Sequence, residues 1–143
     1  MVIYEAVFLN NEEVERLFEL VRGERPHANK PKDYHVTTAF KPEKTAERLY
    51  GKLVSVHIVG YKDAEIATRQ GMTYNEGFKV ELYSTDPEMA KYISENKGNI
   101  HITGSFEDKP VYTGFIDFSD AEEVDCTFIG KFGAFDSDGN IIK

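Results

Sequence analysis

Apolar and polar residues alternate along the chain in the two periods that are typical of strands and helices. Residues 2–9 are β-branched and aromatic enough to predict a strand. Asn10 and Asn11 provide an N-terminal cap for a helix that follows, and Gly23 marks its end. Between them apolar residues recur at helical spacing, at Val14, Leu17, Phe18 and Val21. The chain is therefore expected to begin with a strand and a helix.

The rest of the chain predicts several short strands and one further helix. Strands are expected over 34–40, 53–59, 64–68, 78–83, 100–106 and near 127–132, with a helical turn over 46–50. Thr85 and Glu88 form a capping box with Pro87 in the first turn, which predicts a helix to about Glu95. Helices that are separated from runs of short strands are typical of an α+β fold with a mixed or antiparallel sheet.

Composition indicates one domain over residues 1–143, because no linker, low-complexity tract or composition break divides the chain. The single cysteine, Cys126, cannot pair within the chain, which excludes a disulfide framework and a multi-cysteine zinc site and favours a reducing compartment. No apolar run approaches the roughly 20 residues that span a bilayer, and the first residues lack a signal-peptide pattern. We therefore expect a cytoplasmic protein without a membrane partner.

Charge narrows the range of ligands. The formal net charge of −8 argues against binding of long duplex nucleic acid, which needs clustered cations. Residues 22–52 differ from the rest, because they hold eight cations and four acids, a local net charge of +4. This segment could attract a small anionic ligand, although solvated loop charges would explain the same composition.

Two six-residue segments resemble each other, His-Val-Thr-Thr-Ala-Phe over residues 35–40 and His-Ile-Thr-Gly-Ser-Phe over 101–106. Side chains alternate along a strand, so His35 and Thr37 share one face, as do His101 and Thr103. On adjacent strands, two imidazoles could act as general base and general acid, and two hydroxyls could donate to a phosphate between them. This chemistry requires no metal or cofactor. The alternative is that these histidines are structural, as most strand histidines are.

These two motifs resemble the pair that defines the two-histidine phosphoesterase superfamily, a His-apolar-Thr/Ser-apolar motif in each half of the fold. The resemblance implies a two-lobed, pseudo-symmetric α+β fold with mixed or antiparallel sheets, flanking helices and a central groove. It also implies that His35 and His101 are catalytic and that Thr37 and Thr103 hold the phosphate. Members open 2′,3′-cyclic phosphates on RNA ends or ADP-ribose 1″,2″-cyclic phosphate, and some phage members resemble nucleases of cyclic-oligonucleotide immune signals.

One departure from the family pattern follows each motif threonine, where an apolar residue is usual. Here the positions are Thr38 and Gly104. Gly104 could allow close approach of a substrate or mark a bulge. Outside the motifs, Tyr4 is a candidate for stacking on a base, with core packing as its alternative. Lys41 is a candidate phosphate contact, as Lys109 is, although most such lysines are simply exposed.

The sequence therefore predicts a phosphodiesterase that hydrolyses a cyclic phosphodiester without a metal. Its substrate would be the 2′,3′-cyclic phosphate of an RNA end or nucleotide, or a cyclic oligonucleotide signal. The alternatives are a non-catalytic module that binds a nucleotide or RNA end in the same groove, and an interaction domain in which the motifs are accidental. Specificity is expected in loops over 23–33, 60–77 and 107–114. The role of each histidine, the product and the oligomeric state stay open.

Overall fold

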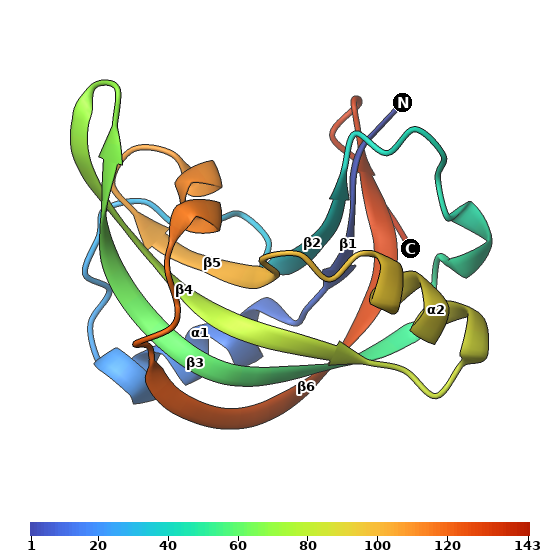
Figure 1. Ribbon diagram of the computed structural model, residues 1–143, viewed down its shortest axis with the longest axis horizontal. Coiled ribbons are helices and arrows are strands. Elements are labelled where there is room, and N and C mark those ends of the chain that lie inside the picture. The colour runs from blue at the N-terminus through green and yellow to red at the C-terminus, as the bar shows by residue number, and fades with distance from the viewer.

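One sheet of seven strands forms most of the protein, and every strand pairing in it is antiparallel (Figure 1). The computed structural model of the chain describes residues 1–143. The strands are β1 (Val2–Phe8), β2 (His35–Phe40), β3 (Leu53–Thr68), β4 (Gly71–Tyr83), β5 (His101–Phe106), β6 (Glu122–Asp136) and β7 (Ile141–Ile142). Their order is β1-β2-β5-β4-β3-β6-β7, and a further pairing of β1 with β6 closes the sheet on itself. The α+β class is confirmed, with an antiparallel sheet.

The helices are α1 (Asn11–Arg22), α2 (Pro87–Glu95) and two short 3-10 helices, η1 (Glu47–Leu49) and η2 (Pro110–Phe115). The Asn10 side chain accepts a hydrogen bond from the Glu13 backbone N–H and so caps α1, as predicted. The cap of α2 is Asp86, one residue after the predicted Thr85, because Pro87 occupies the first helical position and the cap precedes it directly. No helix has the length and apolar character needed to cross a membrane.

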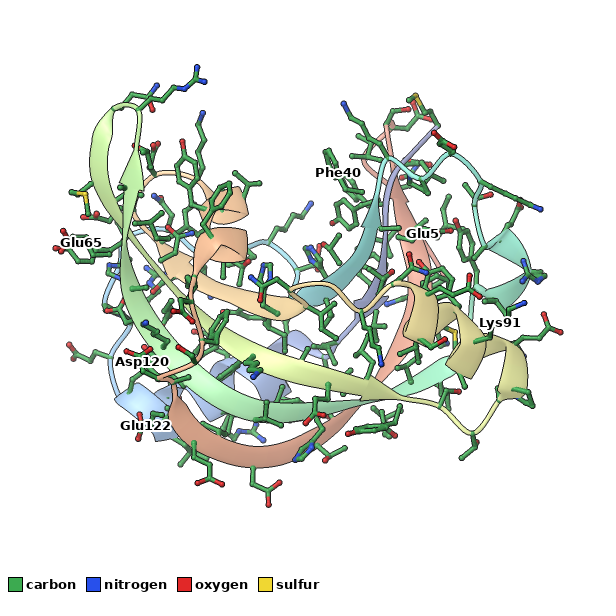
Figure 2. All side chains as sticks on the ribbon, in the orientation of Figure 1. Glu5, Phe40, Glu65, Lys91, Asp120 and Glu122 are labelled. Atoms are coloured by element: carbon green, nitrogen blue, oxygen red, sulfur yellow. The ribbon has the colours of Figure 1, made fainter.

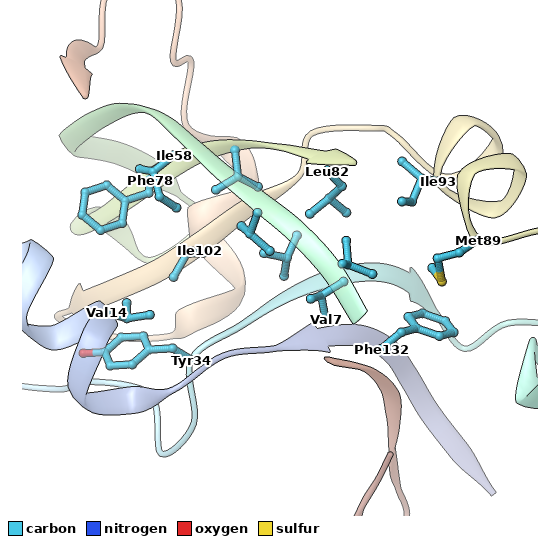
Figure 3. Packing of buried hydrophobic residues seen from close by; sticks show 14 of the residues in the cluster. Val7, Val14, Tyr34, Ile58, Phe78, Leu82, Met89, Ile93, Ile102 and Phe132 are labelled. Carbon is cyan, nitrogen blue, oxygen red and sulfur yellow. The ribbon is translucent and has the colours of Figure 1, made fainter. Parts of the chain in front are cut away.

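One apolar cluster of 18 buried residues forms the main core (Figure 3). Both α1 and α2 pack side chains into it together with six of the strands. Val36 and Ile102, the apolar residues between histidine and threonine in the two motifs, are fully buried there. Burying an aliphatic side chain of this size stabilises the fold by about 1.5–3 kcal/mol, so each motif strand is fixed with this face inward.

The largest difference from the predicted elements is the hairpin of β3 and β4. The prediction of separate strands over 53–59, 64–68 and 78–83, with a loop over 60–77, is wrong, because the two strands run for 16 and 13 residues. Gly60 does not make a turn; it lies at a β-bulge where the register between β3 and β4 shifts. A glycine inside a strand often marks such a bulge rather than a strand end.

Other elements also extend beyond their predicted bounds. β6 covers Glu122–Asp136 rather than 127–132, and most of the predicted loop over 107–114 belongs to η2, which ends at Phe115. The molecule has the outline of a U in Figure 1, with the end of the β3–β4 hairpin as one arm and β1, β2 and the end of β6 as the other. β2, β5 and η2 lie along the inner side of this U.

A buried ion pair fastens α1 to the sheet. The Arg22 guanidinium on the last turn of α1 donates two hydrogen bonds of 2.9 Å to the carboxylate of Glu76 on β4. The Tyr61 hydroxyl and both the backbone N–H and the hydroxyl of Ser105 donate to the same carboxylate. Five donated hydrogen bonds therefore offset the cost of burying this charge.

Candidate active site

The two motif strands are neighbours in the sheet. β2 and β5 pair antiparallel with Val36 opposite Ile102. Because these two residues point into the core, the residues on either side of them point to the opposite face, with each histidine across from the other strand's threonine. We call His35, Thr37, His101 and Thr103 the quartet. All four side chains are partly exposed on this face.

Both imidazoles of the quartet are held in the same way. The Nδ1 atom of His35 lies 2.9 Å from the carbonyl oxygen of Asp33, and Nδ1 of His101 lies 2.8 Å from that of Asn99. Each carbonyl belongs to the residue two positions earlier. Since a carbonyl oxygen only accepts, Nδ1 carries the proton in the neutral ring and Nε2 keeps its lone pair. Neither Nε2 atom has a hydrogen bond to the protein, so both are free for a ligand.

The other two histidines of the chain are bound differently. Nε2 of His27 lies 2.6 Å from a carboxylate oxygen of Asp63, and Nε2 of His57 lies 2.7 Å from one of Asp125. In these two residues the nitrogen that would serve a ligand is already engaged by the protein. Only the quartet histidines combine a fixed Nδ1 with a free Nε2.

Burial lowers the pKa of both quartet imidazoles below the ordinary value. For His35 the hydrogen bond to Asp33 opposes this effect, and the nearby His101 lowers its pKa further. For His101 the hydrogen bond to Asn99 opposes the effect of burial. Because protonation of one ring disfavours protonation of the other, the pair is suited to hold a single proton. One acid and one base is the state that general acid–base catalysis needs.

The threonine hydroxyls of the quartet are also free. Neither Thr37 nor Thr103 has a side-chain hydrogen bond to the protein, and neither hydroxyl is sealed from solvent. Thr38 differs, because its hydroxyl donates to the Glu5 carbonyl at 3.2 Å and lies 2.8 Å from the Tyr92 hydroxyl. Thr38 occupies the β-bulge of β2 against β1, where it has no register partner. A polar residue at this position of the family pattern therefore has a structural explanation.

Gly104 provides space for packing inside the protein. A Cβ atom at this position would lie 2.7 Å from both Cγ of Glu76 and Cζ of Phe18. Of the two alternatives predicted from the sequence, the bulge is confirmed, because the register of β4 against β5 shifts between the pairs Gly77–Thr103 and Asn75–Phe106 and Gly104 lies in that stretch. Close approach of a substrate does not account for the glycine, since it is buried and faces the ion pair of Arg22 and Glu76 rather than the quartet. Its function is to let α1 and β4 approach β5.

Tyr4 packs directly on a histidine of the quartet, whereas Lys41 packs on Phe40. The Tyr4 ring stacks on the His35 imidazole with centroids 4.9 Å apart and planes at 16°, and it also stacks on Phe135. The ring therefore packs beside the quartet and supports the His35 imidazole, and its stacking on a base stays a prediction. Lys41 follows β2 and is exposed, with Nζ 5.5 Å from the centroid of the Phe40 ring. Phe40 is 67% exposed and projects into the open side of the U in Figure 2.

Of two further neighbours of the quartet, sequence reasoning missed Lys79 and expected the other only as a specificity loop over 107–114, most of which is the helix η2. Lys79 on β4 is the register partner of His101, which places it on the same face, and it is exposed without an acidic partner. The short helix η2 packs against β4 and β5 next to the quartet. A Cβ atom on Gly77 would lie 2.8 Å from Cγ2 of Thr113, and one on Gly114 would lie 3.8 Å from Cε1 of His101. No sequence signal marks Lys79, since the contact depends on the register of β4 against β5.

Comparison with family models, with characterised proteins and with solved structures found no match. The functional argument for this chain therefore rests on the geometry of the quartet.

Proposed function

We propose that the protein hydrolyses a cyclic phosphodiester, with the quartet as its catalytic group. The observation that carries this proposal is the equivalence of the two motifs. Each places an imidazole on one of two paired strands, fixes Nδ1 on the carbonyl two residues earlier and leaves Nε2 free. This equivalence supports membership of the two-histidine phosphoesterase superfamily and the pseudo-symmetric arrangement that it implies.

In the proposed reaction, Nε2 of one histidine takes a proton from water while the water oxygen bonds to phosphorus. The other imidazole, protonated, donates its Nε2 proton to the ribose oxygen as the P–O bond to that oxygen breaks. Thr37 and Thr103 donate hydrogen bonds to the non-bridging oxygens, whose negative charge grows in the transition state. For a 3′,5′-linked ring, one imidazole would first deprotonate the ribose 2′-hydroxyl, whose oxygen bonds to phosphorus and forms a 2′,3′-cyclic phosphate. The other imidazole would protonate the 5′-oxygen as its bond to phosphorus breaks.

The proposal is tested with a substrate panel in the presence of EDTA. The panel contains nucleoside 2′,3′-cyclic phosphates, an RNA oligomer with a 2′,3′-cyclic end, and cyclic di- and trinucleotides. We expect turnover of at least one class that persists with EDTA, because the quartet supplies acid, base and phosphate contacts. If the folded protein turns over no compound of the panel but still binds these compounds, the protein is a binding module and not an enzyme for them.

The pH profile of kcat/KM is expected to be bell-shaped with its maximum below about pH 6.5, the ordinary pKa of histidine. One imidazole must be neutral and the other protonated in the free enzyme, so activity peaks between the two pKa values. Burial lowers both values, which moves the whole bell to lower pH. Initial rates at low substrate concentration between about pH 4 and 9 measure this. A rate independent of pH over this range would contradict acid–base catalysis by the pair.

Replacement of Thr103 by valine is expected to lower kcat/KM by about 10²-fold, a typical cost of losing one donor to a developing oxyanion. Valine keeps the shape of threonine but cannot donate, and Thr103→Ser should recover most of the rate. Thr127→Val, at an exposed position on β6, is the matched control and should behave like the wild type. Full activity of Thr103→Val would show that the Thr103 hydroxyl has no role in the reaction.

A further inference from the structure

A surface groove begins beside His101, at the residues Asn99 and Ile100 that precede it. Its volume is about 560 Å³, and it lies between β4, α2 and the segment that leads into β5. Tyr83, Ala90 and Ile100 provide accessible apolar surface in it, and Lys79, Lys97 and Asn99 provide polar groups. This volume lies within the range of small-molecule sites, which combine an apolar lining with a few polar groups.

Two residues belong both to this groove and to the surroundings of the quartet. Lys79 is the register partner of His101 and projects from the same face of the sheet. Asn99 accepts the Nδ1 hydrogen bond of His101 on its carbonyl, and its side-chain amide donates to the Gly114 carbonyl at 2.7 Å. A ligand that extends from the quartet past His101 therefore enters the groove at Lys79.

The charged groups of the groove favour an anion. Lys79 and Lys97 form no ion pair with the protein, as is usual for lysines of this chain, so both ammonium groups are available to a ligand. One acid, Glu81, lines the groove, and the Tyr83 hydroxyl donates to it at 3.1 Å. Two unpaired cations on a chain with a net charge of −8 create a local site for a phosphate.

We propose that this groove binds the nucleotide next to the scissile cyclic phosphate, with its phosphate between Lys79 and Lys97. The inference rests on the proposed function and narrows its substrate class to an oligonucleotide of at least two units. The accessible apolar surface of Tyr83, Ala90 and Ile100 would receive the base or ribose. Such a unit occurs in an RNA end and in a cyclic oligonucleotide, and the experiment separates these two sources.

The test compares kcat/KM for a nucleoside 2′,3′-cyclic phosphate with that for a dinucleotide ending in the same cyclic phosphate. We expect the wild type to prefer the dinucleotide by about tenfold or more, the gain of one charge-assisted phosphate contact. In Lys97→Ala and in Lys79→Ala this ratio should fall towards one. Lys91→Ala, on α2 but outside the groove, is the control and should keep the wild-type ratio (Figure 2). The kcat/KM of a cyclic dinucleotide is measured in parallel for the same variants. The form whose kcat/KM falls in the lysine variants, linear or cyclic, is the one that uses the groove.

Equal kcat/KM values for mononucleotide and dinucleotide in the wild type would overturn the inference, while their hydrolysis would still support the proposed function. If no compound of the whole substrate panel is turned over, the proposed function fails, and a binding measurement then tests the groove by itself. A fluorescent trinucleotide with a 2′,3′-cyclic end is then titrated by anisotropy. Weaker binding by Lys97→Ala than by Lys91→Ala would retain the groove as a nucleotide site, and equal binding would overturn it.

Discussion

Replacing either His35 or His101 by alanine is expected to lower kcat/KM for cyclic phosphate hydrolysis by about 10²–10⁴-fold, the usual contribution of a general acid or base. Each variant removes one Nε2 atom of a pair that must act together, so the double variant should be little worse than either single one. The measurement is initial rates on the best substrate of the panel, with urea unfolding of each variant to establish that it is folded.

His57→Ala is the matched control for these two variants. His57 is also a strand histidine with one fixed ring nitrogen, but its partner is the Asp125 carboxylate and it lies on β3, outside the quartet. This variant should retain the wild-type rate. Since the His35 ring stacks on Tyr4, His35→Gln provides a second, less disruptive removal of the imidazole. A folded His35 or His101 variant with most of its activity left would refute the catalytic assignment.

Replacing Glu76 by alanine is expected to lower the free energy of unfolding by about 3–5 kcal/mol, the usual cost of removing one partner of a buried ion pair. The Glu76 side chain is completely buried and that of Arg22 is 9% exposed, so Arg22 would be left without its counter-charge away from water. The hydroxyls of Tyr61 and Ser105 would lose their acceptor as well. Equilibrium urea unfolding at neutral pH measures the loss.

Glu88→Ala is the control for this comparison, because it also breaks a glutamate–arginine pair. Glu88 and Arg48 are 64% and 65% exposed, and an exposed pair of this kind contributes at most about 1 kcal/mol. Similar losses in the two variants would show that the buried pair has no special role in stability.

The contribution of Glu76 to the free energy of unfolding should also depend on pH. Burial alone would raise the pKa of this carboxyl, but the hydrogen bonds from Arg22, Ser105 and Tyr61 outweigh it and lower the pKa in the folded protein. A lowered folded-state pKa means that the stabilisation is fully present above the ordinary carboxyl value of about 4.3 and is lost as the pH falls through the lower folded value. The difference between wild type and Glu76→Ala should therefore shrink in acid.

Much of the secondary structure follows from local sequence. Asn10 and Gly23 bound α1 because side-chain capping and a positive φ of 79° are properties of single residues. Alternation along the motif strands placed each histidine and threonine on one face, because a strand repeats every two residues. The same local reasoning failed at Gly60, where a bulge inside β3 and a turn between strands favour the same residue.

The tertiary structure decided how these elements meet. No local sequence pattern predicts that β2 lies next to β5, that Lys79 lies on the same face as His101, or that β1 also pairs with β6. Strand order and register are settled by the burial of residues far apart in sequence. The need for Gly104 likewise appears only once Glu76 and Phe18 are packed against it. The sequence by itself determined which groups could perform the chemistry, whereas long-range packing decided that they lie together, because contacts between distant residues leave no local pattern.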